Sequence, residues 1–397
     1  MNAQQNILIA SGGIIITSAA LLLGNKYPVS RAIVSTTKDP SPVSVNALAA
    51  ADPPLKPAGN AALPIGSIKP LTTPQSAPRP RTAPAPAVNE IMAWIYPGQQ
   101  TCGAKTEYSD GRKIDVLKPQ YFTVGWDGGL NLLTEQSDGC NGYSPQNVVD
   151  LKKYSKEQYA TVASGDASSM NVFLTAALSD NASVNTLVSF AVDNKITGIE
   201  IDFEDFGNWD ANSYDNYKKF IDKLGLALHN KGKKLMIDGP ATSNKVEENW
   251  YRWRYADFIS LPVDKIVVMT YDYQFDQGPG QAIAPASWVK NVISWTLGRF
   301  PLKNRLSFGI ASYGYKVLAG TQKFTLLTYD EIRREPGFST AKRDPGSGEM
   351  MWQNGDTLYV YNDGTSMDKE LQTVNDAGIN SVSVWHMGGD PWFGHNS

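Results

Sequence analysis

The sequence predicts an α/β fold, a (β/α)8 TIM barrel in which eight parallel strands alternate with helices. Short apolar runs recur from residue 89 onward, and helix-like segments separate many of them. In addition, a row of acids ends the fourth run, where catalytic groups lie in such barrels. A doubly wound open sheet is the alternative, but no GxGxxG sequence follows the first run.

The expected strands are eight short runs rich in apolar residues. In chain order they are Ile91–Tyr96, Tyr121–Trp126, Asn171–Leu178, Thr197–Phe203, Lys234–Asp238, Lys265–Tyr271, Arg305–Ser312 and Ser381–Trp385. Apolar residues recur at helical spacing in Leu187–Lys195, Tyr214–Leu228 and Ala286–Leu297. We interpret the segment between Tyr315 and Met367 as a small insertion before the last strand.

The fourth run carries three acids at alternate positions, Glu200, Asp202 and Glu204. Side chains of a strand alternate between its faces, so the three carboxyl groups share one face and the apolar residues share the other. Burying acids is costly unless they are hydrogen-bonded or share protons. Such a ladder suits a glycosidase, which needs one carboxyl with a raised pKa as proton donor and a second to stabilise developing positive charge.

Two other interpretations of the ladder stay open. On an edge strand the acids would face water, although the flanking helical segments favour a parallel strand buried on both faces. Dense oxygen ligands suit calcium, but the loop glycine and spacing of an EF-hand are absent. We expect no metal and no cofactor, because His229, His386 and His395 form no HExxH motif and no GxSxG elbow exists.

Composition excludes some functions and leaves others open. The net charge is −3 and 19% of residues are charged, so no basic surface for nucleic acid is expected. Ten Trp and eighteen Tyr suit a cleft that stacks sugars, although large cores also use aromatic residues.

Cys102 and Cys140 lie in Gly-rich polar loops after the first and second strands. A disulfide between them is expected if the domain is exported.

The chain divides into three parts. Residues 7–24 are uncharged and mostly aliphatic, which predicts a transmembrane anchor within residues 1–24, with a cleaved signal peptide as the alternative. Residues 25–88 hold over half of the 24 prolines and read as a disordered Pro/Ala-rich linker. Residues 89–397 form the predicted catalytic barrel. Lys26, Arg31 and Lys38 follow the apolar segment, and the positive-inside rule would keep the barrel in the cytoplasm.

The fourth run resembles the DGxDxDxE motif of family 18 glycoside hydrolases, the chitinase-like barrels. Gly198, Asp202 and Glu204 match that motif, whereas Thr197 and Glu200 stand where the family usually has Asp. Because Glu200 carries one methylene more than Asp, its carboxyl reaches further. Since the three acids are coupled, we expect this difference to change how all three titrate, rather than how one of them does.

Further segments match the family in the correct order. Val268–Asp272 resembles the sixth-strand MxYD, Trp385 the Trp that ends the eighth strand, and Gly309–Tyr315 the seventh-strand PxYG without its proline. Phe203 and the stretch Met269–Pro285 look most like the bacterial branch that includes spore-cortex and peptidoglycan N-acetylglucosaminidases.

The resemblance implies a substrate-assisted mechanism, in which the sugar's own 2-acetamido oxygen is the nucleophile and the product configuration is retained. Glu204 would be the acid and then the base, Asp202 would orient the acetamido group, and Tyr271 would donate a hydrogen bond to it. The resemblance also implies that four residues contact the substrate: Glu200, Met269, Asp272 and Trp385.

The expected function is therefore a retaining glycosidase acting on β-1,4-linked N-acetylglucosamine polymers, either peptidoglycan or chitin. A non-catalytic, lectin-like barrel is the alternative, although its usual mark is a lost catalytic Glu and Glu204 is present. The expected partners are a polysaccharide substrate and, through residues 7–24, a membrane, but no nucleic acid. We expect a monomeric catalytic domain outside the cytoplasm, associated with a membrane, cell envelope or virion, or else secreted.

Overall fold

The computed structural model describes residues 90–394, except 110–111, 113, 275–279, 322 and 390. The predicted anchor at 7–24 and the predicted linker at 25–88 lie outside the described residues. Within the part of the chain that is described, no helix is both long and apolar enough to span a bilayer.

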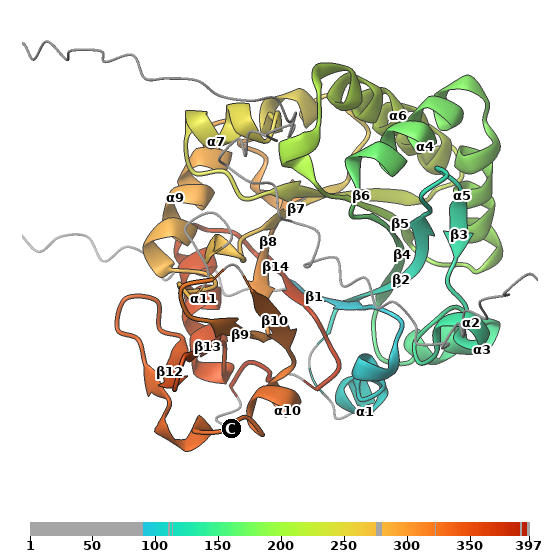
Figure 1. The fold of residues 1–397 in the computed structure, drawn as a ribbon. Helices are drawn as coiled ribbons and strands as arrows, with labels where there is room; N and C mark the ends of the chain where they lie inside the picture. The colour runs from blue at the N-terminus through green and yellow to red at the C-terminus, as the bar shows by residue number, and fades with distance from the viewer. Residues whose placement is uncertain are drawn as a thin grey trace, which may run out of the picture. The chain divides into compact units, whose positions relative to one another are not determined.

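Eight parallel strands close into a barrel, as the sequence predicts (Figure 1). Each strand pairs with the next, and the last pairs with the first to complete the ring. Around the ring they are β1 (Glu90–Ile95), β2 (Val116–Val124), β4 (Glu157–Ser164), β5 (Gly198–Phe203), β6 (Lys234–Pro240), β7 (Lys265–Met269), β8 (Leu306–Ala311) and β14 (Ser381–Trp385). A short strand, β3 (Leu130–Leu132), adds to β2 in the antiparallel sense.

Helices cover the outside of the barrel. The larger ones are α4 (Ala167–Ser179), α5 (Ala182–Asp193), α6 (Ala211–His229), α9 (Ala286–Leu297) and α11 (Gly364–Asp376), and the shorter ones are α1 (Ala104–Ser109), α2 (Glu135–Asp138), α3 (Pro145–Leu151), α7 (Lys245–Trp250) and α10 (Tyr329–Ile332). The three helices expected from apolar spacing all form, as α5, α6 and α9. Asp210 fixes the start of α6, because its side chain accepts a 2.7 Å hydrogen bond from the Ser213 N–H.

One predicted strand is wrong. Asn171–Leu178 lies inside α4, and the third barrel strand is β4, which the sequence analysis did not identify. Phe173, Leu174 and Ala177 are buried at the three- and four-residue spacing of a helix. A short apolar run does not by itself separate a buried strand from a buried helix. In β4 the polar Gln158 and Thr161 hide the apolar character of a strand that is almost wholly buried.

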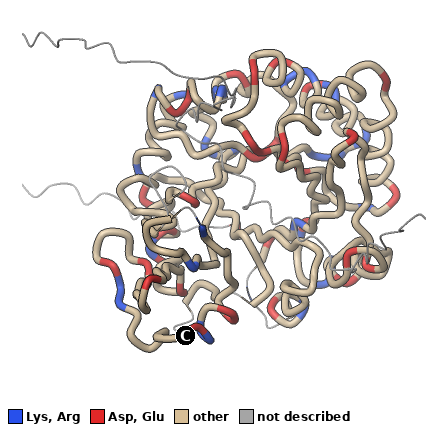
Figure 2. The backbone as a smooth tube through the Cα atoms, viewed as in Figure 1, with Lys and Arg blue, Asp and Glu red and all other residues tan. Residues whose placement is uncertain are grey.

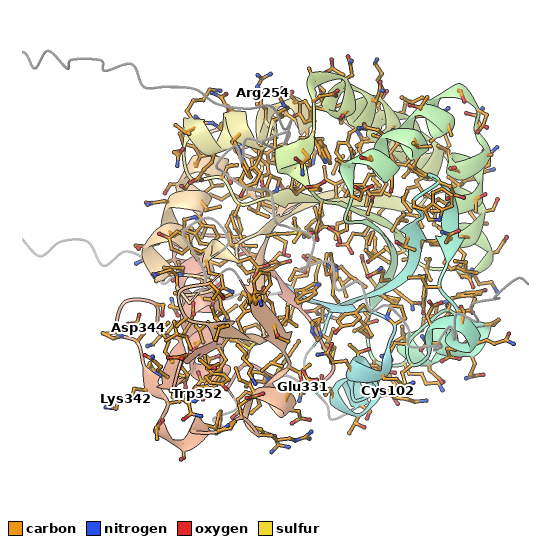
Figure 3. The ribbon with its side chains drawn as sticks, viewed as in Figure 1. Cys102, Arg254, Glu331, Lys342, Asp344 and Trp352 are labelled. Atoms are coloured by element: carbon orange, nitrogen blue, oxygen red, sulfur yellow. A yellow bond between two sulfur atoms is a disulfide. The ribbon has the colours of Figure 1, made fainter. Side chains whose placement is uncertain are left out.

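The predicted insertion is a separate five-stranded antiparallel sheet between β8 and β14. Its strands are, from edge to edge, β10 (Phe324–Leu327), β9 (Gly314–Leu318), β13 (Thr357–Tyr361), β12 (Met350–Asn354) and β11 (Lys342–Arg343). Trp352 stacks on Tyr359 with ring centroids 4.1 Å apart. Glu331 of α10 joins the insertion to the loop after β1, since it accepts a 2.8 Å hydrogen bond from Gln100 (Figure 3).

Cys102 and Cys140 form the expected disulfide. It connects the segment after β1 with the segment that follows β2 and β3, and Cys102 lies beside α1 in Figure 3. Both cysteines therefore belong to connections that start at the carboxyl ends of barrel strands. This is the end of a (β/α)8 barrel on which active sites are built.

The interior of the barrel changes from apolar to polar along its axis. Five inward side chains form one apolar cluster toward the amino ends of the strands: Met92, Val116, Tyr159, Met236 and Val267. Two residues further along four of those strands stand Trp94, Lys118, Thr161 and Asp238, which face inward because side chains alternate along a strand. The carboxyl end of the barrel thus carries the polar groups.

Candidate active site

Glu204 stands directly after β5, at the mouth of the barrel. Its backbone is held on both sides: its N–H donates to Ser164 C=O at 2.8 Å, and its own C=O accepts from Trp209 Nε1 at 2.8 Å. The side chain is 6% exposed, and Oε2 has no hydrogen-bond partner among the described residues. A buried carboxyl with a free oxygen on a rigid backbone is typical of a group that contacts a substrate.

Burial, followed by the charges of the neighbouring Asp272, Asp238 and Asp205, raises the pKa of Glu204 to about 8. A general acid has to carry its proton at the working pH, which an ordinary glutamic acid does not do at neutrality. Figure 2 shows the acidic residues that gather on the inner side of the barrel near β5 and β6. Burial, the largest of the effects on its pKa, favours the protonated form of Glu204.

Asp202 lies between Glu200 and Glu204 on the same face of β5, as the ladder predicts. Burial raises its pKa well above the ordinary value, and the charges of Glu204 and Glu200 act in the same direction. Its Oδ1 has no hydrogen-bond partner within the described part of the chain. Asp202 is therefore a second buried acid with a free oxygen beside Glu204.

Glu200 has a different environment from the other two acids. Lys118 Nζ donates to its Oε1 at 2.5 Å, while Trp94 Nε1 and the Thr161 hydroxyl donate to its Oε2 at 2.7 and 2.5 Å. Neither Glu200 nor Lys118 has any exposed surface. The extra methylene of Glu200 thus carries its carboxyl to partners on β1, β2 and β4.

Tyr271 follows β7 and points toward the acids. Burial raises its pKa well above the ordinary value, with the charges of Asp202, Asp238, Glu204 and Asp272 adding to the effect. Gly309 on β8 makes room for the ring, because a Cβ at that position would lie 2.5 Å from Tyr271 Cε1 and 3.3 Å from Met269 Cα. Tyr271 and Met269 therefore pack closely against β8 at the barrel mouth.

Asp272 adopts a left-handed backbone conformation, with φ 63°. Its Oδ1 accepts hydrogen bonds from the hydroxyls of Tyr313 at 2.5 Å and Tyr315 at 2.7 Å. Burial raises the pKa of Asp272 to about 6, although the two tyrosine hydrogen bonds lower it. A non-glycine residue in this region, held by two hydroxyls, is typical of a functional position.

Trp385 ends β14 and is 8% exposed. Its ring stacks with Tyr96 at 6.1 Å, meets Tyr313 edge-on at 4.9 Å and lies 6.5 Å from Tyr271, centroid to centroid. The Trp385–His386 peptide bond is cis. An indole held by three aromatic rings, one of them Tyr271, gives the site a rigid apolar surface.

The seven residues predicted for the site therefore converge on the carboxyl end of the barrel, while their individual roles stay predictions. The sequence analysis missed the partners that support them: Trp94, Lys118, Thr161, Asp238, Tyr313 and Tyr315. Two of these carried a local signal. Lys118 interrupts the apolar sequence of β2, and Asp238 interrupts that of β6.

The pKa of Glu204 gives a testable pH dependence for any hydrolysis at this site. Because the acid must be protonated, we expect the rate to fall as the pH rises through about 8, rather than through the ordinary glutamic acid pKa near 4.3. The pH profile of kcat/KM measures this limb in the free enzyme. An alkaline limb below pH 6 would contradict the burial and charge effects described for Glu204.

The chain is similar in sequence to curated bacterial proteins. A curated relative from Bacillus subtilis, the uncharacterized glycosylase YvbX, is 29% identical over 181 residues, or 45% of this chain and 49% of its own length. The cortical fragment-lytic enzyme of the same organism is 22% identical over 226 residues, 52% of this chain and 49% of its own. The chain thus spans about half the length of the curated relatives it matches.

Solved structures share the fold at low identity. A chitinase from Chromobacterium violaceum has a TM-score of 0.63 and 21% identity, covering 76% of this chain and 95% of its own. The spore cortex-lytic enzyme SleL of Bacillus megaterium has a TM-score of 0.63 and 15% identity, covering 78% of this chain and 73% of its own. The sequence profile of glycosyl hydrolases family 18 matches residues 127–390, more than half of the 397 residues. The chain belongs to glycosyl hydrolases family 18.

Proposed function

We propose that this protein is a retaining glycosidase that hydrolyses β-1,4-linked N-acetylglucosamine polymers, with peptidoglycan as the favoured polymer and chitin as the other candidate. The observation that carries the proposal is Glu204, a buried acid with a pKa of about 8 and an unpaired oxygen at the barrel mouth. Cortex-lytic enzymes stand among the relatives, and chitinases among the structures of similar fold.

In this mechanism Glu204 protonates the glycosidic oxygen, and the 2-acetamido oxygen of the same sugar attacks the anomeric carbon. Asp202 and Tyr271 orient the acetamido group and stabilise the charge that develops on it. Trp385 supports the apolar face of the sugar. Glu204, having given up its proton, then activates the water that opens the ring-fused intermediate. A lectin-like barrel has no need of a buried acid that keeps its proton at neutral pH.

The direct test is to incubate the full chain with purified peptidoglycan and, separately, with chitin oligomers, and to identify the products by mass. We expect soluble muropeptide fragments from peptidoglycan. Cleavage of chitin alone would move the proposal to a chitinase. Binding to both polymers without any product would favour the lectin-like alternative.

Trp126 supports a polymeric substrate rather than a small one. It is 89% exposed and follows β2, so it lies at the end of the barrel that carries Glu204. Its turn is fixed by hydrogen bonds of 2.8 Å from Gly125 N–H to Gly129 C=O and from Gly128 N–H to Gly125 C=O. An exposed indole on a fixed turn is suited to stacking on a sugar unit beyond the one that is cleaved.

We expect Trp126→Ala to lower kcat/KM on long oligomers by about two- to tenfold, the range that an aromatic stacking contact supports. An oligomer too short to reach Trp126 is expected to lose nothing. Leu226→Ala, which removes another exposed apolar side chain on α6, is the matched control. Equal loss on all lengths would show that Trp126 acts on stability rather than on substrate.

We also propose that the barrel works outside the cytoplasm, with residues 7–24 as its membrane anchor. The Cys102–Cys140 disulfide supports an oxidising compartment, where such bonds persist, and wall polymer is found on that side of the membrane. The Lys and Arg residues after residue 24 favour the opposite orientation, but long domains are translocated largely regardless of flanking charge. Free thiols in native protein that resists external protease would contradict this placement.

A further inference from the structure

The interior of the barrel holds more acids than cations. Of the lysines and arginines in the described ranges, Lys118 is the one that is buried, and it pairs with Glu200. Asp202, Glu204 and Asp238 are buried beside that pair without a cation of their own. Ionised carboxylates are not tolerated in such a place without partners, so some of these acids must hold protons.

Glu200 already receives three hydrogen bonds, from Lys118, Trp94 and Thr161. A carboxylate offers about four acceptor positions, so one position remains. Each of the three donors lies on a different strand, and the hydrogen-bond lengths are 2.5 to 2.7 Å. This arrangement fixes Glu200 as the anion of the group.

Asp238 occupies the position next to this anion. It lies on β6, which pairs with β5, and its side chain has no exposed surface. Neither of its oxygens has a hydrogen-bond partner among the described residues, and Glu200 on the neighbouring strand is the charged group that acts on it most strongly. Two carboxyl groups form a hydrogen bond only if one of them carries a proton.

The electrostatic surroundings assign that proton to Asp238. Burial raises the pKa of Asp238 well above its ordinary value, and the charges of Glu200 and Asp202 raise it as well, against a lowering effect of Lys118. The other titratable groups that interact with Asp238 lie on the β5–α6 connection, α6, the turn after α7, and the end of β7: Glu204, Tyr217, Tyr255 and Tyr271. None of these four is a cation.

We propose that Asp238 is a positioning residue that stays protonated in the folded protein and donates its proton as a hydrogen bond to the Lys118-paired carboxylate of Glu200. Glu200 then has no acceptor left for Asp202. The Asp202 carboxyl therefore stays available to Glu204 and the substrate, and it does not share a proton with Glu200. The effect on catalysis rests on the proposed glycosidase function, but the protonation of Asp238 does not.

The first test needs no activity. In the unfolded chain Asp238 ionises near pH 3.9, whereas in the folded protein it keeps its proton. Rising pH therefore destabilises the wild type relative to Asp238→Asn, which does not ionise. We expect the ratio of their unfolding equilibrium constants, measured with urea on the full chain, to grow about tenfold per pH unit above about pH 4. The ratio stops growing once the pH exceeds the pKa that Asp238 has in the folded protein.

Two further variants make this test decisive. Asp193→Asn changes an exposed acid of α5 and is expected to give a ratio that does not depend on pH. Asp238→Leu has the same branched side-chain shape, although it is larger, and it also does not ionise, so it gives the same pH slope as Asp238→Asn if the latter fails to fold. A flat ratio for the Asp238 variants would show that Asp238 is ionised in the folded protein and would overturn the proposal.

The second test examines positioning. Asp238→Asn keeps an N–H that donates to Glu200, whereas Asp238→Leu does not, so we expect kcat of the Asn variant to exceed that of the Leu variant about tenfold. In the Leu variant Asp202 shares its proton with Glu200, which moves the acidic limb of the pH profile upward by about one unit. Equal kcat values for the Asn and Leu variants, with an acidic limb at the same pH in both, would overturn the positioning role. This holds even if the unfolding test confirms that Asp238 is protonated.

Discussion

Glu204→Gln is expected to remove hydrolysis while the barrel stays folded. The side chain keeps its shape, but it no longer has a proton to transfer to the glycosidic oxygen. General acid catalysis contributes about 10²–10⁴-fold, so we expect kcat to fall by at least the lower of these factors. The measurement is the rate of product release from N-acetylglucosamine oligomers or peptidoglycan at neutral pH.

Stability separates this loss from misfolding. The variant is expected to be more stable than the wild type above about pH 5, because it lacks an acid whose pKa rises to about 8 on folding. Glu135→Gln, which changes an exposed acid at the start of α2, is the matched control and is expected to keep full activity. A Glu204→Gln enzyme within about threefold of wild type would remove Glu204 from the mechanism.

A substrate without the 2-acetamido group is expected not to be cleaved. In the proposed mechanism this group is the nucleophile, and an attached, well-oriented nucleophile corresponds to an effective concentration of about 10⁵–10⁸ M. Oligomers of glucose with the same β-1,4 linkage carry a hydroxyl there and lack that nucleophile. We expect their turnover to be at least about a thousandfold below that of N-acetylglucosamine oligomers of equal length.

The same experiment tests the role of Asp202. If glucose oligomers were cleaved at a comparable rate and with retention, a carboxylate of the enzyme would have to be the nucleophile, and Asp202 is the one beside Glu204. Asp202→Asn then distinguishes the mechanisms: under substrate assistance it slows the enzyme by losing the orienting charge, whereas a lost covalent nucleophile abolishes turnover. The anomer formed first, observed by NMR, reports retention independently.

The parts of the site that could be predicted are those encoded within single short segments. Asp202 and Glu204 stand two residues apart on one strand, and Tyr271 and Asp272 are adjacent at the end of another. Strand alternation places Asp202 and Glu204 without any knowledge of the neighbouring strands, whereas Tyr271 and Asp272 were expected from the resemblance to the family's sixth-strand motif. The barrel itself was also predictable, because the alternation of strands and helices is a pattern along the chain.

The parts that could not be predicted depend on register between strands. Lys118 reaches Glu200 because β2 lies beside β4 and β4 beside β5, and this contact joins residues 82 positions apart. In the sequence Lys118 only interrupts an apolar run; the second strand was expected at Tyr121–Trp126, whereas β2 spans Val116–Val124. Asn171–Leu178 was misassigned for a related reason, since only tertiary packing decides whether a short apolar run becomes a strand or a helix.

Protein engineers who exchange the insertion between homologous barrels need to choose the crossover points with care. The hydroxyl of Tyr315 holds Asp272, although Tyr315 lies in β9 of the small sheet. It pairs there with Val360 of β13, so both strand ends support the catalytic centre. A chimera that replaces 319–356 keeps these contacts, whereas one that replaces the whole sheet exchanges part of the active site along with it.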